Sequence, residues 1–448
     1  MIATAITRGL AGLSLALRQP LPAFCEIETA HGNALVTRQC DYLSVVRIEG
    51  MRRMAKRDDV ERIATAQRID LAGALEDRGH AIVGWYISDP DMAGVEIERL
   101  NLASCRTIAR ELGLNVSDVL DERAALWPRI MRWEAAYYVL WTRRAVLTKE
   151  ERRQMAEEQK ILSREGPRAG TSQRYYLRSE VMAARHSAFV SRVVAALGNN
   201  DVATRELDAH EALKMIRESV YRETAGSDWQ ATLPGDKVMP RATEDPDSGE
   251  NPASGMLWPA VAEQMFHADA ETLGGQRVRI GDHDYAPVDM AIGPEDPRPF
   301  VELSARLGQD RIPWRSAVVI EGGGRNAMQI KEVAATFLSM FPGNADIRRA
   351  FEALRQARNE DNHIGVRLRA SFATWAPAGD MRLLRRRAST LAQRIEGWGN
   401  CKTTPIAGDP LEGALSSVPG LSLTSTGTPQ IALLGDAFAM LPWNRSRW

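Results

Sequence analysis

The order of strand-like and helix-like segments in the first 115 residues constrains the fold more than any other feature. Residues 22–50 contain β-rich segments that alternate in polarity and are separated by turn residues. A helical pattern follows over Asp58–Asp77, then a short apolar segment at Ala81–Ser88, then a second helical pattern over Ala93–Leu112. This β-β-α-β-α order predicts a split antiparallel α/β unit of the ferredoxin-like kind.

The second half of the chain repeats this order of elements. Val278–Ile280 and Tyr285–Ile292 flank a Gly281-Asp282 turn, as the two strands of a hairpin do. Apolar segments predict further strands over 317–320, 364–372 and 402–406. Helical spacing of apolar residues predicts helices over 326–341, 345–358 and 380–398. The expected fold class is α+β, with two split antiparallel α/β (ferredoxin-like) lobes and an intervening helical region.

A length of 448 residues is too great for one ordinary core and favours two or three domains. Residues 224–256 are rich in Pro, Gly, Asp and Ser and lack periodicity, which predicts a linker or mobile loop. In the helical region, Thr148 and Glu151 fit a capping box. The predicted organisation is an N-terminal arm at 1–20, a first α/β lobe at 21–115, a helical region at 116–223, the linker at 224–256, a second α/β lobe at 257–430 and a strap at 431–448.

The charge balance and the cysteines exclude several classes of protein. With 57 basic and 58 acidic side chains the net charge is −1, so no overall field attracts nucleic acid or anionic lipid. The four cysteines form no C-x-x-C pair and predict free thiols in a reducing cytoplasm. No apolar run reaches the roughly 18 residues of a membrane span. The apolar stretch Gly9–Leu17 lacks the cleavage site of a signal peptide, which favours an arm or a short amphipathic helix.

The sequence contains no P-loop, because Gly is nowhere followed by Lys and a P-loop requires that pair. One segment, Gly322–Ala327, does match the G-x-G-x-x-A pattern of dinucleotide-binding loops. Gly322, Gly324 and Arg325 are therefore the only nucleotide-binding candidates. The preceding hairpin pattern argues against a parallel βαβ unit, so a glycine-rich turn before a helix is the favoured interpretation. No cofactor and no catalytic residue are predicted.

Two clusters of acidic residues and histidine are compared with metal sites. In the first, Asp282-His283-Asp284, successive residues of a strand point to opposite faces, so ordinary turn chemistry is favoured. The second, with Asp208 and His210, lies within one helical turn but lacks the H-E-x-x-H spacing, and a solvated helix face is favoured. No metal site is predicted.

Two segments are predicted as interfaces. The first is a basic run on the polar face of the helix over 380–398, where Arg385 and Arg386 could contact an acidic partner or lipid headgroups, although a solvated face is the usual interpretation. The second is the strap, in which large apolar residues lie among polar ones and usually pack on something. Packing of the strap on its own lobe remains the alternative. The strap candidates are Leu441, Trp443, Arg445 and Trp448.

Several motifs, in their order and spacing, resemble the N-terminal region of ATPases of the DotO/IcmB type. The tail Met440–Arg445 (MLPWNR) resembles the segment that leads into the ATPase domain of these proteins. The similarity runs from about residue 17 to the end of the chain. Its other motifs are Cys25–Thr29 (CEIET), Gly79–Asp91 (GHAIVGWYISDPD), Ile312–Arg315 (IPWR), Ile320–Gly324 (IEGGG) and Ala414–Gly420 (ALSSVPG).

The resemblance implies the assembly and docking module of a type IVB secretion or conjugation ATPase. Such a module is cytoplasmic and peripheral at the bacterial inner membrane. Its implied partners are its own or a separate ATPase domain, inner-membrane secretion components and further copies of itself, without sequence-specific nucleic acid. ATP and Mg²⁺ belong to a C-terminal P-loop domain that these residues do not contain. The alternatives are an independent enzyme that uses the Gly322–Ala327 loop for a nicotinamide or flavin cofactor, and a DNA-handling factor in conjugation.

Overall fold

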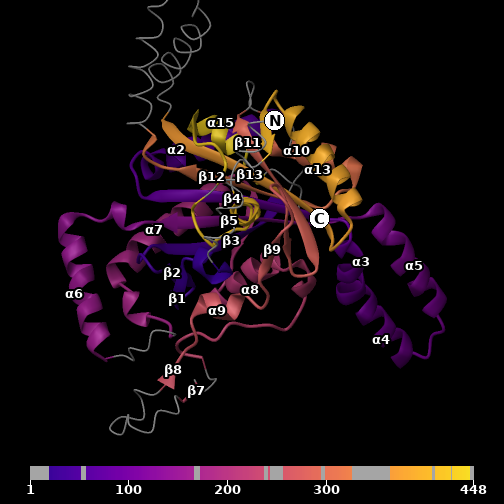
Figure 1. The fold of residues 1–448 in the computed structure, drawn as a ribbon, viewed down its shortest axis with the longest axis horizontal. Helices are drawn as coiled ribbons and strands as arrows, with labels where there is room; N and C mark the ends of the chain where they lie inside the picture. The colour runs from indigo at the N-terminus through magenta and orange to yellow at the C-terminus, as the bar shows by residue number, and fades with distance from the viewer. Residues whose placement is uncertain are drawn as a thin grey trace, which may run out of the picture.

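The computed structural model describes residues 20–51, 57–165, 172–236, 241–242, 256–293, 298–324, 364–405, 409–424 and 426–443. Residues 1–19 of the predicted arm, the predicted helices over 326–341 and 345–358, and most of the predicted linker lie outside these residues. Within them, one antiparallel sheet of thirteen strands forms the centre of the molecule (Figure 1). Its main path runs in the order β1-β2-β3-β5-β4-β12-β13-β11-β10-β9.

The first half of the chain supplies one side of this sheet. Its hairpin β1–β2 turns at Gly32, whose φ of 60° suits glycine, as the turn sequence predicts. The strands are β1 (Ile27–His31), β2 (Ala34–Thr37), β3 (Tyr42–Met51), β4 (His80–Asp89), β5 (Trp133–Thr142) and β6 (Val202–Glu206). Two of them, β5 and β6, lie within the region at 116–223 that was predicted to be mainly helical. Most of β5 is buried, so its sequence WEAAYYVLWT lacks the polar alternation that marks a half-exposed strand.

The second half of the chain continues the same sheet. Strand β12 pairs antiparallel with β4 from Ala81↔Glu321 to Ser88↔Trp314, and with β13 on its other side. The α+β class is therefore confirmed, with the strands of both halves joined in one large, mainly antiparallel sheet. These strands are β9 (Ala270–Thr272), β10 (Val278–Ile280), β11 (His283–Ile292), β12 (Trp314–Glu321), β13 (Gly365–Pro377), β14 (Lys402–Pro405) and β15 (Gln430–Leu433). A separate two-stranded ribbon pairs β7 (Arg241–Ala242) with β8 (Met256–Leu257).

Each face of the sheet is covered by its own set of helices. Successive strand residues point to opposite faces, so Ile82 and Tyr86 of β4 join one core while Val83 and Trp85 join the other. The first core is covered by α2 (Arg57–Leu75), α7 (Glu180–Gly198), α10 (Phe300–Asp310), α13 (Met381–Glu396) and α15 (Leu434–Ala439). The second is covered by α8 (Ala209–Val220), α9 (Val261–Met265) and α14 (Pro410–Ser416).

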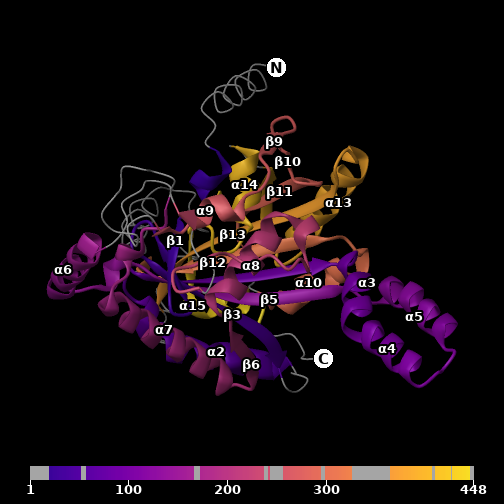
Figure 2. The same ribbon diagram turned by 90° about the horizontal axis from the view of Figure 1, so that it is seen from below.

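The remaining helices lie at the two ends of the long axis (Figures 1 and 2). At one end, α6 (Lys149–Glu165) begins at the predicted capping box, in which the Thr148 amide donates to Glu151 at 2.8 Å and the Glu151 amide to the Thr148 hydroxyl at 3.2 Å. At the other end, α3 (Met92–Ile97), a π-helical turn (Glu98–Leu102), α4 (Ala103–Glu111) and α5 (Ser117–Ile130) extend away from the sheet. Short 3₁₀ turns occur at Leu21–Phe24, Arg144–Val146, Tyr175–Leu177 and Arg222–Thr224. No helix within the described ranges is long and apolar enough to cross a membrane.

Candidate functional site

The glycine-rich loop after β12 packs closely against its own chain. The Gly322 amide donates to the His80 carbonyl at 3.0 Å, and a Cβ added at Gly322 would lie 2.3 Å from the Asp77 carbonyl oxygen. A Cβ at Gly324 would lie 2.3 Å from the Gly365 carbonyl oxygen. Strand β12 is antiparallel to both neighbours, so no parallel βαβ unit precedes the loop. Close backbone packing accounts for Gly322 and Gly324, and Arg325 lies outside the described residues.

The acidic turn before β11 uses its side chains in local contacts. The buried carboxylate of Asp284 accepts bonds from Arg279 Nε at 2.7 Å and from the Gly379 amide at 2.8 Å. His283 Nδ1 lies 3.6 Å from a Glu223 carboxylate oxygen. Among the residues that the structure describes, no three His, Cys, Asp or Glu side chains are grouped so that they could hold a metal ion.

The second acidic cluster begins helix α8. Asp208 caps the helix, accepting from the Glu211 amide at 2.8 Å, while the Glu211 carboxylate accepts from the Asp208 amide at 3.2 Å. His210 turns away to Asp236, with 3.0 Å between Nε2 and the carboxylate. This capping box gives each residue a structural role, because it satisfies amides that a helix start leaves unpaired.

The basic run on α13 divides into a structural and an exposed part. Arg387 is partly buried, donates to the Trp375 carbonyl at 2.7 Å, and has its pKa lowered by burial. Arg385 and Arg386 are exposed, and their guanidinium groups form no ion pair with another described residue. These two arginines stay available as interface candidates.

The C-terminal tail packs on the sheet of this chain. Leu441 and Trp443 are fully buried in the first core, and the Trp443 indole nitrogen donates to the Phe438 carbonyl at 3.0 Å. Gly84 in β4 provides the space, because a Cβ there would lie 2.5 Å from a Leu441 methyl carbon and 2.9 Å from a Pro442 ring carbon. The strap prediction is therefore corrected for these two residues: the alternative, packing on the chain itself, describes them. Arg445 and Trp448 lie outside the described residues.

Residues 92–131 form the helical projection, which sequence analysis did not single out (Figure 2). The projection has a small core of its own, made by Ile97, Leu102 and Leu120 with Trp127 against them. Arg106 ties its helices together, because its guanidinium lies 2.9 Å from both Glu98 and Asp121. The projection is thus an ordered unit rather than a loose arm.

Large apolar side chains also lie on the outside of the projection. Ile108 of α4 and Leu112, the residue that ends this helix, are four residues apart. On α5, Val119, Leu126 and Ile130 are seven and four apart, so each set shares one helix face. Ile108 is 53% exposed and Ile130 is 68% exposed. A group of exposed apolar side chains marks a contact surface more often than single ones do. The feature of the sequence that could have indicated this surface is the presence of apolar residues on two faces of one helix.

The chain matches no protein-family model and no curated protein. The outward apolar surface of the projection, the packed glycine loop and the buried tail are therefore the features from which a function has to be inferred.

Proposed function

We propose that this chain is an assembly and docking module of a type IV secretion (conjugative transfer) ATPase of the DotO/IcmB type. The motifs of the sequence, in their order and spacing, support the family. The exposed apolar side chains of the helical projection carry the docking role, because soluble proteins rarely leave a large apolar patch uncovered. In this proposal each half of the sheet is a split unit of the ferredoxin-like kind. The module binds no nucleotide, and ATP and Mg²⁺ act in a P-loop domain.

The partner of the projection is, in this proposal, an apolar protein surface of an inner-membrane secretion component. Residues 92–131 contain five arginines and six acidic residues, which gives a net charge of 5 − 6 = −1. This charge gives no attraction to anionic lipid, so the membrane surface itself is a poor partner. The module would then lie in the cytoplasm and stay peripheral at the inner membrane, where copies of it assemble into a homo-oligomer.

Co-sedimentation with membranes tests the docking role. Ile108→Ser combined with Ile130→Ser removes apolar surface from both helices of the projection. Ile69→Ser is the matched control, because Ile69 is 65% exposed on α2, away from the projection. Wild type and Ile69→Ser should sediment with membranes that contain the secretion apparatus and stay soluble with membranes that lack it. The double variant should stay soluble with both. Equal binding to both membranes, or full binding by the double variant, would contradict the proposal.

The two alternative functions have less support. An enzyme that binds a dinucleotide at the Gly322–Ala327 loop needs open space above the glycines, and that space is filled by the backbone at Asp77 and Gly365. A DNA-handling factor needs a positive surface, and the chain as a whole carries a charge of −1. An absorbance scan of the purified protein for bound flavin tests the first of these directly.

A further inference from the structure

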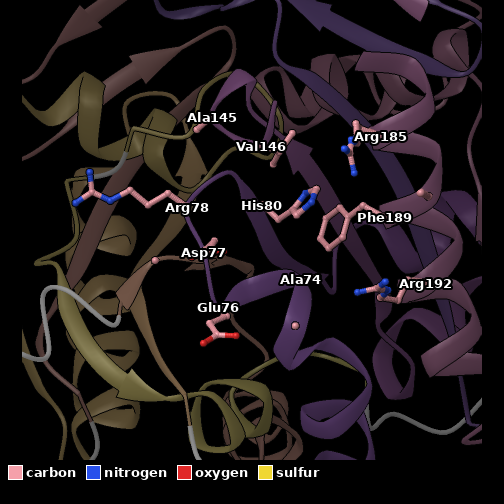
Figure 3. A pocket seen from close by; sticks show the side chains of 13 residues that line it. Ala74, Glu76, Asp77, Arg78, His80, Ala145, Val146, Arg185, Phe189 and Arg192 are labelled. Atoms are coloured by element: carbon pink, nitrogen blue, oxygen red, sulfur yellow. The ribbon is translucent and has the colours of Figure 1, made fainter. Parts of the chain in front are cut away.

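A cleft of about 670 Å³ opens between the C-terminal end of α2, the start of β4 and the exposed side of α7 (Figure 3). Its size falls within the roughly 300–1,000 Å³ of small-molecule sites. The wall on α7 carries Arg185 and Arg192, and the turn that follows α2 carries Glu76, Asp77 and Arg78. The elements that line the cleft lie toward the opposite end of the molecule from the helical projection (Figure 1), and no residue of the projection or of the tail lines it.

The floor of the cleft is a pair of stacked rings held by buried hydrogen bonds. The His80 imidazole stacks on the Phe189 ring, with centroids 4.1 Å apart and planes at 21°. His80 Nδ1 lies 3.3 Å from the Thr142 hydroxyl, which lies 2.9 Å from His186. Burial lowers the pKa of His80 to about 4, and Arg192 and Arg185 contribute to the shift. The floor is therefore uncharged at neutral pH and offers a flat, rigid surface.

Of the two arginines on the α7 wall, only Arg185 has an ion-pair partner among the described residues. Arg185 is held in place by Glu151, which accepts from its Nε at 2.9 Å and its Nη2 at 2.6 Å. Arg192 lies seven residues later, about two helical turns along α7 and on the same side. It makes no hydrogen bond or ion pair with another described residue, and its guanidinium points from α7 into the cleft toward the side of Ala74 (Figure 3).

We propose that this cleft binds the phosphate group of a small phosphomonoester, with Arg192 as the principal ligand and Arg185 as the second. A guanidinium presents paired N–H donors that match two phosphate oxygens. The non-phosphate part of the ligand lies over His80 and Phe189. On the facing wall, the carboxylates of Glu76 and Asp77 with the guanidinium of Arg78 sum to a charge of −2 + 1 = −1, which disfavours a second anionic group, so the site selects one phosphate and rejects a nucleic-acid backbone.

Binding of glycerol 3-phosphate to the full chain tests this site by calorimetry, with glycerol as the uncharged control ligand. Arg192→Gln removes the principal ligand. Arg164→Gln is the matched control, because Arg164 is an exposed arginine on α6 that forms no ion pair with another described residue. Wild type and Arg164→Gln should bind glycerol 3-phosphate and not glycerol. Arg192→Gln should bind it about tenfold or more weakly, as expected for the loss of a charged hydrogen bond.

Vesicles distinguish a free ester from a lipid headgroup. Phosphatidylcholine vesicles with and without phosphatidic acid present the same phosphate chemistry on a membrane. Binding that requires phosphatidic acid and is lost in Arg192→Gln assigns the site to a headgroup, whereas binding of glycerol 3-phosphate alone assigns it to a soluble ester. The proposal is overturned if wild type binds neither probe, or if Arg192→Gln binds as tightly as wild type. Both results are independent of whether the projection docks.

Discussion

Two apolar segments of this molecule have opposite environments. In the tail, Leu441 and Trp443 are fully buried and the indole nitrogen is hydrogen-bonded. In the projection, Ile108 and Ile130 keep more than half of their surface exposed. The tail has a receiving surface, because Gly84 leaves room on the central strand, whereas the apolar side chains on the outer faces of α4 and α5 stay exposed. Apolar content alone therefore does not separate a core segment from a docking segment; the complementary surface does.

The largest expected effect is at Trp443. Trp443→Ala removes a fully buried side chain from the first core and should lower the free energy of unfolding by about 3–5 kcal/mol. Urea denaturation of the purified chain measures this change. Leu126→Ala on the projection is the matched comparison and should change the free energy by less than about 1 kcal/mol, because Leu126 is about half exposed. Equal losses for the two variants would remove the contrast between tail and projection.

The receiving surface of the tail is tested at Gly84. Gly84→Ala places a methyl group 2.5 Å from Leu441, and overpacking of this kind destabilises by about 1–3 kcal/mol. Leu441→Ala removes the obstructing methyl groups, so the double variant should lose less stability than the sum of the two single variants. A double-mutant cycle in urea gives this coupling. Strict additivity would mean that the tail does not lie over Gly84.

Histidines distinguish the sheet from the projection, since residues 92–131 contain none. Burial lowers the pKa of His186 to about 3, so as the pH falls from 7 to 5 the unfolded chain takes up a proton that the folded chain does not. This lowers the stability of the wild type by at most about 2 kcal/mol over that range, relative to an unfolded-state pKa near 6.5.

The variant His186→Gln isolates this contribution. Its melting temperature should improve relative to wild type as the pH falls from 7 to 5, whereas membrane docking by the projection should not depend on pH through histidine. A constant difference in melting temperature between variant and wild type at both pH values would show that the buried imidazole is not the source.

The smallest expected effect is on the outer face of the projection. Ile108→Ser and Ile130→Ser should each change the free energy of unfolding by no more than about 0.5 kcal/mol, because both side chains are already largely in water. Thermal melting of each variant checks this value. A loss comparable with that of Trp443→Ala would place these residues in a core and would leave the docking role without its basis.

The sequence predicted those turns, caps and secondary-structure elements that depend only on residues close together in the chain. The hairpin turn at Gly32, the cap at Thr148 and the strand and helix over 364–398 needed only neighbouring residues. The pairing of β4 with β12 did not follow, because it joins residues 81–88 to residues 314–321 and periodicity carries no information about such partners. Strand β5 was missed because most of it is buried and does not alternate in polarity.

The candidate sites show the same limit. On α5, Leu120 is buried and the adjacent Val119 is exposed, yet both are apolar, so the sequence does not say which stripe is covered. Arg192 lies on a helix whose charged residues resemble any solvated face. Its position beside the His80–Phe189 pair depends on the packing of α7 against β4, which only the fold determines.

The pairing of β4 with β12 also has a consequence for how the protein is made. A ribosome releases β4 more than two hundred residues before its partner, so the nascent first half presents an apolar strand edge during most of synthesis. Pairing across such a separation is slow, because the chain loses the entropy of closing a long loop before the strand contacts contribute favourable free energy. We therefore expect the open edge of β4 to need protection by chaperones during translation, and a fragment that stops before residue 314 would carry this edge permanently.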